Sequence, residues 1–512
     1  RTSRRRAHNS GDACPRAGAR SDTTWNGAVN IVDPLHEHAR RTPSRAAVVH
    51  PGGTLTWAQL DRALCSGADF LHARGIRPGA RVGLTIRAPI AHLVASLALA
   101  RIGASHVALS ATDPPAVRRE SAAFLGLTHV VGDADDADLP GVACVRFAPV
   151  GDAAPGSSEP SPPTPRADGD ASAAWLFLKS SGTTGAPKFA ELSHAISFER
   201  SARYRAGYGY RDGDVFWTGV GAAFITPKQH FLSALQAGVT ICVSEGLGIS
   251  RALVAFLRAS HVTLAYATPS QMWELIDACE GGPALDGIRV FMSGTTTVSR
   301  ELREAFGAKV CPNLYVNYGT NEAPALSIAS PALLARIPDA VGVPSGSVEL
   351  QIVDGEGRAL APGETGEIRV RGTGVVRAYF SNPDATAKSL PDGWFHPGDL
   401  GFLTVDGALV LQGRVDDMMI FDGVNIFPAE IERVLGAHPA VREAAAYPIA
   451  HPRFGDVPAA AVTLSAPATE AELIRWCEAR LGVKHPRKIR VVQDFPRNSI
   501  GKIVKRALST SA

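Results

Sequence analysis

The stretch Ser180-Ser181-Gly182-Thr183-Thr184-Gly185-Ala186-Pro187-Lys188 decides the fold of this chain. It follows the apolar run Trp175 to Leu178, which is typical of a buried strand. Glycines let a backbone approach a ligand closely, hydroxyls and amides donate hydrogen bonds, and a lysine adds positive charge. The spacing is not that of the P-loop, which has four residues between its first glycine and its glycine–lysine pair. A hydroxyl-rich linker is the alternative, but the position after a strand favours a polyphosphate-binding loop.

Composition restricts the class of protein. A chain of 512 residues is too long for one hydrophobic core, so we expect two or more domains. A net charge of +3 gives no reason to expect a nucleic-acid-binding or membrane-surface protein. The seven cysteines are scattered without metal-ligand spacing, which favours reduced thiols in a cytoplasmic protein. The most apolar stretch, residues 92–109, contains Arg101 and is not a membrane span.

The first 24 residues are rich in arginine, serine, glycine and alanine. They have no apolar segment of the kind found in a secretory signal. A transit peptide is the alternative, but a disordered tail fits this composition better.

Strands alternate with helical patterns from about residue 30, which indicates an α/β fold with a mainly parallel sheet. We expect strands at 53–57, 82–86, 106–109, 264–267, 290–292 and 314–316, and helices at 58–73 and 89–101. Short strands with tight turns follow residue 348. Beyond about residue 415 the pattern predicts a small α+β domain, with helices at 430–435 and 470–481 and a strand at 489–492.

Three further motifs carry chemistry. Asn317-Tyr318-Gly319-Thr320-Asn321-Glu322 follows a strand, where an aromatic ring can stack on a base and a carboxylate can hold magnesium. Asp399 and Arg414 offer a carboxylate and a guanidinium for a ribose diol. Near the C-terminus, Gly501-Lys502 presents one lysine. Taken singly, these motifs also fit a polar turn, a turn aspartate and a solvent-exposed lysine.

In this order, the four motifs resemble the adenylate-forming (AMP-binding) superfamily of acyl- and aryl-CoA synthetases, stand-alone adenylation domains and luciferases. The resemblance spans about residues 31–508. It implies a large N-terminal domain of mainly parallel sheets with a β-rich subdomain (25–414) and a small, mobile α+β C-terminal domain (415–512). It also implies a two-step reaction. A carboxylic acid attacks the α-phosphate of magnesium-ATP, giving an acyl adenylate and pyrophosphate, and a thiol then takes the acyl group and releases AMP.

The resemblance also implies residue roles. The residues implied to bind phosphate are Ser181, Gly182, Thr183, Thr184, Gly185 and Lys188, and Thr184 is also expected near the metal. The nucleotide side comprises Gly294, Thr295, Asn317, Tyr318 (adenine stacking), Gly319 and Thr320 (α-phosphate), while Asp399 and Arg414 hold the ribose. Glu322 binds Mg²⁺, and Lys502 stabilises the transition state of adenylation through its charge. Asp416 is the hinge, and Gly423 lines the tunnel for the thiol of coenzyme A or of a carrier protein.

The chain departs from the family pattern at three places. Phe189 stands where glycine usually follows the loop lysine, and Asn321 stands where threonine usually precedes the glutamate. Ala222 and Ala223 replace a gating residue and a polar selecting residue, and Phe224 is left to act as the gate. With Ala323, these three residues form the expected acid pocket.

The acid remains open from the sequence. No aspartate stands where amino-acid-activating members hold an α-ammonium group, which favours a fatty, aryl or other simple carboxylate. Lys228 and His230 follow what resembles a capping box at Thr226 and Pro227, so we expect them on a helix surface, with Phe231, Leu232 and Leu235 facing inward. The favoured activity is an acyl-CoA synthetase. The alternatives are an adenylation enzyme that loads a carrier protein in trans and a non-catalytic nucleotide-binding relative.

Overall fold

A computed structural model describes residues 30–109, 113–132, 139–147, 170–180, 188–221, 225–497 and 503–509. The predicted N-terminal tail, residues 181–187 of the phosphate loop, the pocket residues 222–224 and Lys502 lie outside these ranges. The six described cysteines are free thiols. Among the helices described, none is both long enough and apolar enough to cross a bilayer.

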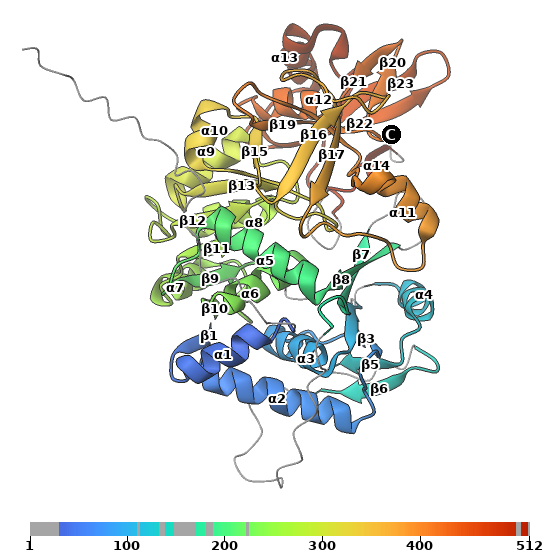
Figure 1. Cartoon of the computed structure of the whole chain (residues 1–512). Coiled ribbons are helices and arrows are strands. Elements are labelled where there is room, and N and C mark those ends of the chain that lie inside the picture. Colours follow the sequence, from blue (N-terminus) through green and yellow to red (C-terminus); the bar gives the residue numbers. More distant parts are fainter. Residues whose placement is uncertain are drawn as a thin grey trace, which may run out of the picture.

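The first sheet of the large domain has six strands in the order β6-β5-β3-β4-β7-β8 (Figure 1). Only β8 runs antiparallel to its neighbour. The strands are β3 (Arg81–Leu84), β4 (Ser105–Ala108), β5 (His129–Gly132), β6 (Ala143–Arg146), β7 (Ala174–Ser180) and β8 (Lys188–Ser193). The accompanying helices are α2 (Trp57–Ala73), α3 (Pro89–Ile102) and α4 (Pro115–Leu125). The predicted phosphate loop thus connects β7 to β8.

The second sheet has thirteen strands and runs from a parallel half into an antiparallel half. The parallel half contains β1 (Ala46–His50), β9 (Val215–Thr218), β10 (Thr240–Cys242), β11 (Leu264–Tyr266), β12 (Val290–Ser293) and β13 (Leu314–Tyr318), with β2 (Gly53–Thr56) antiparallel at its edge. The antiparallel half contains β14 (Ser327–Ala329), β15 (Ala340–Pro344), β16 (Val348–Val353), β17 (Gly366–Gly372), β18 (Asp399–Leu403) and β19 (Leu409–Arg414). The helices that belong to this part are α1 (Asp33–Arg41), α5 (His194–Tyr208), α6 (Ile225–Gln236), α7 (Arg251–Ala259), α8 (Pro269–Ala278), α9 (Arg300–Lys309), α10 (Pro331–Arg336) and α11 (Pro383–Ser389), with the short 3₁₀ turn η1 (Pro391–Gly393).

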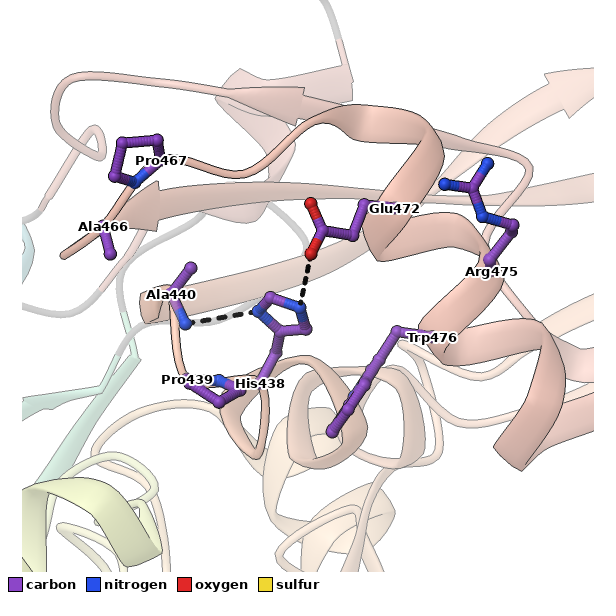
Figure 2. Close-up of a pocket in the computed structure, with 8 residues that line it drawn as sticks. All are labelled: His438, Pro439, Ala440, Ala466, Pro467, Glu472, Arg475 and Trp476. Carbon is purple, nitrogen blue, oxygen red and sulfur yellow. Dashed lines mark hydrogen bonds and ion pairs between the residues drawn. The ribbon is translucent and has the colours of Figure 1, made fainter.

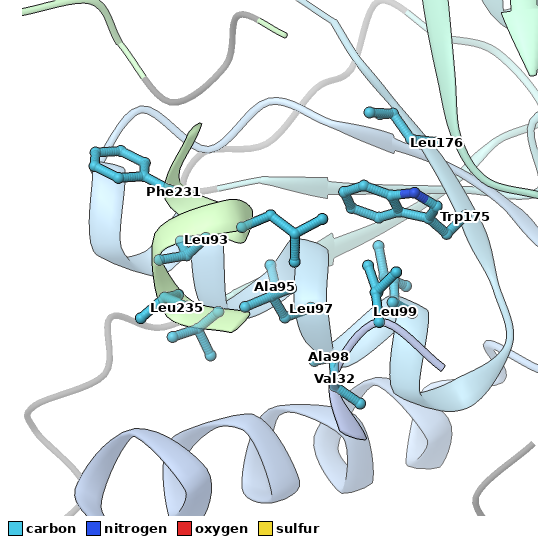
Figure 3. Close-up of a cluster of buried hydrophobic side chains, with 14 of the residues drawn as sticks. Val32, Leu93, Ala95, Leu97, Ala98, Leu99, Trp175, Leu176, Phe231 and Leu235 are labelled. Atoms are coloured by element: carbon cyan, nitrogen blue, oxygen red, sulfur yellow. The ribbon is translucent and has the colours of Figure 1, made fainter. Parts of the chain in front are cut away.

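The largest core lies where the two sheets meet. Helix α3 is apolar on almost every side, which is typical of a helix buried all round. Figure 3 shows Leu93 and Leu97 of α3 in one cluster with Trp175 of β7 and Phe231 of α6. Burying each such large side chain contributes about 1.5–3 kcal/mol. The core therefore fixes β7, and with it the entry to the phosphate loop, against the second sheet.

The small domain holds a third sheet, of five strands. Its strands are β20 (Met419–Phe421), β21 (Val424–Ile426), β22 (Val441–His451), β23 (Gly455–Leu464) and β24 (Lys488–Val491). Its helices are α12 (Pro428–Gly436), α13 (Glu470–Leu481) and α14 (Lys505–Ser509), with the 3₁₀ turn η2 (Gly482–Lys484). This domain lies at one end of the molecule in Figure 1, and β19 of the large domain leads into β20 through residues 415–418.

The predicted α/β class is confirmed, and the expected elements lie within a few residues of their predicted bounds. The cap at Thr56 is a complete capping box with Gln59. Helix α13 spans the residues that the pattern predicted, and α12 has Pro428 at its first position.

The interpretation of α6 was wrong in part. The helix begins at Ile225, so Thr226 lies inside it. Phe231, Leu232 and Leu235 are buried as predicted, but Lys228 and His230 are buried too, with exposed fractions of 3% and 0%. His230 lies against the rings of Tyr204 and Phe216, and Lys228 contacts His106 of the first sheet. Because α6 is enclosed between the two sheets, it has no solvent face here.

Candidate active site

Two distant motifs meet at a hydrogen bond between Tyr318 and Asp399. The Tyr318 hydroxyl donates to Asp399 Oδ2 at 2.7 Å, across 81 residues of sequence. Burial, and secondarily Asp399, raise the pKa of Tyr318 well above its usual value, so the hydroxyl stays protonated and donates. Arg414 is the ladder partner of Asp399, and its Nη1 lies 3.8 Å from Asp399 Oδ1. Together the three residues form a carboxylate held between a phenol and a guanidinium.

Two tight turns lie against each other at the carboxyl ends of β12 and β13. A Cβ on Gly294 would stand 2.0 Å from Asn317 Oδ1, and a Cβ on Gly319 would stand 2.6 Å from the Ala325 nitrogen. Both positions therefore require glycine. The backbone of Thr295 has φ of 75°, in the left-handed region that non-glycine residues rarely adopt. Since ligands bind at the carboxyl ends of parallel strands, these turns mark the expected nucleotide side.

The Glu322 carboxylate is buried, with an exposed fraction of 6%, and contacts a residue outside the predicted set. The Tyr379 hydroxyl donates to Glu322 Oε1 at 2.8 Å. The Tyr379 ring lies 5.7 Å from the Nζ atom of Lys188, which begins β8. Tyr379 therefore connects the closing lysine of the phosphate loop to the predicted magnesium ligand.

The backbone next to Glu322 is held by two buried arginines of α5. Arg200, with an exposed fraction of 0%, donates to the carbonyls of Glu322 and Gly374, each at 2.8 Å. Arg203 donates to the Pro324 carbonyl at 2.7 Å. Burial lowers the pKa of Arg200 to about 9, which leaves it charged at neutral pH. Because α5 follows directly from β8, the two arginines link the phosphate-loop side to the glutamate turn.

Of the other predicted residues of the glutamate turn, Thr320 contacts the turn itself and Asn321 contacts strand β7. The Thr320 hydroxyl accepts from the Ala323 nitrogen at 3.2 Å, and Ala323 is fully buried. Asn321 donates to the Lys179 carbonyl at 3.4 Å, near the end of β7. The substitution at Asn321 is thus compatible with the turn.

Phe189 has a packing role. It is fully buried, and its ring stacks on Phe124 with centroids 5.7 Å apart. Its carbonyl accepts from the Phe380 nitrogen at 2.7 Å, one residue beyond Tyr379. The residue that departs from the family glycine therefore anchors β8 beside the site.

The hinge candidate lies at the junction to the small domain, and the tunnel candidate lies in a turn of that domain. Asp416 is exposed between β19 and β20. Gly423 forms the exposed β20–β21 turn with φ of 79°, where no atom would obstruct a Cβ. Arg497 donates to Ser270 of α8 at 3.1 Å and pairs with Glu443, which docks the small domain on the large one.

A cavity of about 540 Å³ lies elsewhere in the small domain (Figure 2). It is lined by His438, Pro439, Ala440, Ala466, Pro467, Glu472, Arg475 and Trp476. His438 points toward Glu472, with 3.7 Å between the nearest atoms, and meets Trp476 edge to face. The described residues predicted for the nucleotide site do not line this cavity.

Sequence reasoning missed Tyr379, Arg200 and Arg203. Tyr379 lies in Arg377-Ala378-Tyr379-Phe380, which has no local pattern of its own. The two arginines are three positions apart in a helix, where a solvated face is the usual interpretation. Their neighbours Glu199 and Arg205 are charged as well, so the local sequence gives no sign that either arginine is buried.

The two-domain α/β fold, the hydrogen-bonded Tyr318 and Asp399, and the buried Glu322 are what we expected of a nucleotide-binding enzyme. Comparison with family models identifies the family of this enzyme. A model described as AMP-binding enzyme matches residues 35–380, and one described as AMP-binding enzyme C-terminal domain matches residues 430–502. The chain belongs to the AMP-binding enzymes, as its motifs predicted.

Individual relatives agree with this assignment. A feruloyl-CoA synthase from Amycolatopsis is 29% identical, covering 91% of this chain and 96% of that protein. A 2-succinylbenzoate–CoA ligase from Bacillus mycoides is 27% identical, covering 93% and 97%. The structure of Bacillus subtilis o-succinylbenzoate CoA synthetase with ATP and magnesium has a TM-score of 0.82 at 25% identity, covering 93% and 98%.

Proposed function

We propose that this chain activates an aromatic carboxylic acid with ATP and transfers the acyl group to coenzyme A. In the first step a carboxylate oxygen attacks the α-phosphorus, and the bond to pyrophosphate breaks. In the second step the thiolate sulfur attacks the acyl carbon, and AMP leaves. The observation that carries the proposal is the 2.7 Å hydrogen bond joining Tyr318 to Asp399, with Arg414 beside them and the Glu322 turn immediately after Tyr318.

This geometry supports the following proposed residue roles. Asp399 accepts hydrogen bonds from the ribose hydroxyls and is oriented by Tyr318 and Arg414. Gly294 and Gly319 allow the two turns on the nucleotide side to pack closely, and Lys188 contributes charge to the phosphates. We further propose that Phe224 gates the acid pocket and that Lys502 stabilises the charge that develops on the phosphate oxygens.

A magnesium ion fits the donor set. Glu322 presents a carboxylate that the Tyr379 hydroxyl holds, and the Tyr379 ring lies beside Lys188, the first residue of β8. With Thr184, Glu322 would hold this ion. When bound, Mg²⁺ neutralises phosphate charge.

We propose domain limits of 25–414 and 415–512, with Asp416 as the pivot between the two half-reactions. β19 ends at Arg414, so the ribose-binding residues stay with the large domain. Gly423 moves with the small domain and lines the path of the thiol.

Two observations favour an aromatic acid over a fatty one. The names of the two curated relatives both specify ligases of aromatic acids. In this chain the fully buried His230 is surrounded by Tyr204, Tyr208 and Tyr266, and Tyr208 accepts a hydrogen bond from Asn317 in the predicted site. The Asn317 side chain connects this ring cluster to the turn at Gly294.

The test is a screen of carboxylic acids for acid-dependent exchange between pyrophosphate and ATP, followed by thioester formation with coenzyme A. We expect cinnamate- and benzoate-type acids to support both steps, and Lys502→Ala to abolish exchange. Exchange by Lys502→Ala at the wild-type rate would refute the role of Lys502. Activity confined to medium- and long-chain fatty acids would refute the substrate class.

A further inference from the structure

Lys228 of α6 carries a buried ammonium group whose hydrogen-bonding capacity is mostly unused. The residue is 3% exposed, and its Nζ atom lies 3.0 Å from Nε2 of the fully buried His106. An ammonium has three donors, and among the described residues His106 is its only hydrogen-bond partner. The lysine ion pairs of the described chain belong to Lys179, Lys484 and Lys505, so no described carboxylate neutralises Lys228.

The side chains around this ammonium are oriented and neutral. His106 Nδ1 lies 2.8 Å from the Trp175 carbonyl and carries the proton, so Nε2 accepts from Lys228 and from Ser96 Oγ, which is 2.9 Å away. His92 of α3 is held through Nδ1 by a backbone carbonyl at 3.1 Å, and its buried Nε2 has no partner in the described structure. Burial lowers the pKa of His92 to about 3 and that of His106 well below its usual value. In this group, which we call the Lys228 cluster (His92, Ser96, His106 and Lys228), only the lysine can be charged at neutral pH.

The Lys228 cluster lies beside the candidate active site. Lys228 is in the first turn of α6, the helix that follows β9, and the carboxyl ends of β9, β12 and β13 lie at one edge of the second sheet. Two residues further along α6, His230 lies against Tyr208, which accepts a hydrogen bond from Asn317 at that edge. On the other side, His106 is bonded to β7, whose carboxyl end leads to the phosphate loop. A substrate whose reacting carboxylate lies at this edge can therefore extend its far end along α6 to Lys228.

We propose that the acid substrate carries a second carboxylate, and that Lys228 binds it. This inference rests on the proposed function and deepens it, since it assigns the enzyme to aromatic dicarboxylic acids. A carboxylate would accept hydrogen bonds from the unused Nζ donors and supply the counter-charge that the described structure does not provide. An apolar far end would leave the ammonium without that partner. Buried polar groups are normally satisfied within a fold, so one left without partners beside an active site points to a ligand.

The first experiment compares acids that differ in the charge of the far substituent, with acid-dependent pyrophosphate exchange by the full chain as the readout. 4-Carboxycinnamate carries a carboxylate where 4-acetylcinnamate carries a neutral group of similar shape, and the 3-substituted pair tests a second position on the ring. For at least one pair we expect kcat/KM of the wild type to be at least about tenfold higher with the carboxylated acid, the gain from one charge-assisted contact. Equal or lower values with the carboxylated acid of both pairs would overturn the proposal.

Lys228→Met removes the ammonium and should abolish this preference. Lys388→Met makes the same change at an exposed lysine and should retain it. A loss of kcat/KM that Lys228→Met shows equally for the carboxylated and the acetylated acid would overturn the proposal, because that result indicates a structural effect. The comparison of acids by the wild type does not depend on whether this variant folds.

The pH profile of the wild type gives a readout that a packing role would not change. Burial lowers the pKa of Lys228 to about 7, so above that pH the charged fraction falls about tenfold per pH unit. Since the charged form is the one that attracts a carboxylate, KM for the carboxylated acid should rise as pH increases from about 7 to about 9, and KM for the acetylated acid should not. An equal rise for both acids would overturn the proposed contact. Failure of the proposed function is distinguishable, since no carboxylic acid of either kind would then support pyrophosphate exchange.

Discussion

At the scale of single residues, Tyr379 is the most informative side chain that the motifs did not predict. It lies 57 residues from Glu322 in sequence, yet its hydroxyl orients the Glu322 carboxylate while its ring faces Lys188. A hydrogen bond to a carboxylate restricts its orientation before the metal and nucleotide bind. The cost of arranging the site is thereby reduced.

Tyr379→Phe should keep the ring and remove this hydrogen bond. The net contribution of such a bond, about 0.5–1.5 kcal/mol, predicts a roughly threefold to tenfold increase in the Mg²⁺ concentration needed for half-maximal pyrophosphate exchange. Titration of Mg²⁺ at saturating ATP measures this shift.

The matched control is Tyr210→Phe. The Tyr210 hydroxyl is buried and has no hydrogen-bond partner among the described residues, so this variant should leave the Mg²⁺ requirement unchanged. An identical shift in both variants would count against a positioning role for Tyr379.

How far the site could be predicted depended on whether the contacts were local. Gly319 was identified from its place in a polar turn after a strand and Gly294 from the family resemblance, and the structure gives each a steric reason. Phe189 looked like a defect in the loop, because its partner Phe124 lies far away in the sequence and its packing cannot be read from neighbouring residues.

At the scale of elements, α6 shows what periodicity cannot reveal. The pattern identified one inward face correctly from Phe231, Leu232 and Leu235. It could not show that a second layer covers the opposite face, because that depends on how the two sheets pack. Lys228 is consequently a buried ammonium, 3.0 Å from His106, with no carboxylate partner among the described residues.

Burial lowers the pKa of Lys228 to about 7 from its usual 10.5. The unfolded chain therefore binds more protons than the folded one between these pH values. Stability should accordingly increase as pH rises from about 7 to 10.5, by at most about 5 kcal/mol from this group.

Lys228→Met should stabilise the protein at pH 7 and flatten this rise. His106 keeps its hydrogen bond with Ser96 Oγ at 2.9 Å, so the variant leaves no new unpaired group there. Urea denaturation at pH 7 and pH 9 measures the effect, with the exposed Lys388→Met as control. Destabilisation by Lys228→Met with an unchanged pH dependence would mean that other interactions already offset the cost of burying the Lys228 ammonium.

At the scale of the whole molecule, the two domains are joined by residues 415–418 and by ion pairs at the surface between them. Arg433 pairs with Asp339 at 3.0 Å, and Arg442 pairs with Asp277 at 3.4 Å. These pairs are partly exposed, so each contributes little, about 0–1 kcal/mol. Weak contacts of this kind suit a domain that changes position during the reaction.

Asp416→Pro should separate the two half-reactions. Proline fixes φ near −65° and so restricts rotation at the proposed pivot. We expect pyrophosphate exchange within about twofold of wild type and thioester formation reduced more than about tenfold. Asp416→Ala, which retains a rotatable backbone, should perform both steps. Full thioester formation by the proline variant would place the pivot elsewhere.

The path of the chain through residues 415–418 has a practical consequence. Since no described strand of the third sheet pairs with the other two, a cut there would interrupt no hydrogen-bonded ladder. The two pieces could be produced as independent polypeptides and mixed. Catalysis would then become bimolecular, and its rate on dilution would report directly how tightly the smaller piece re-associates at each stage of turnover.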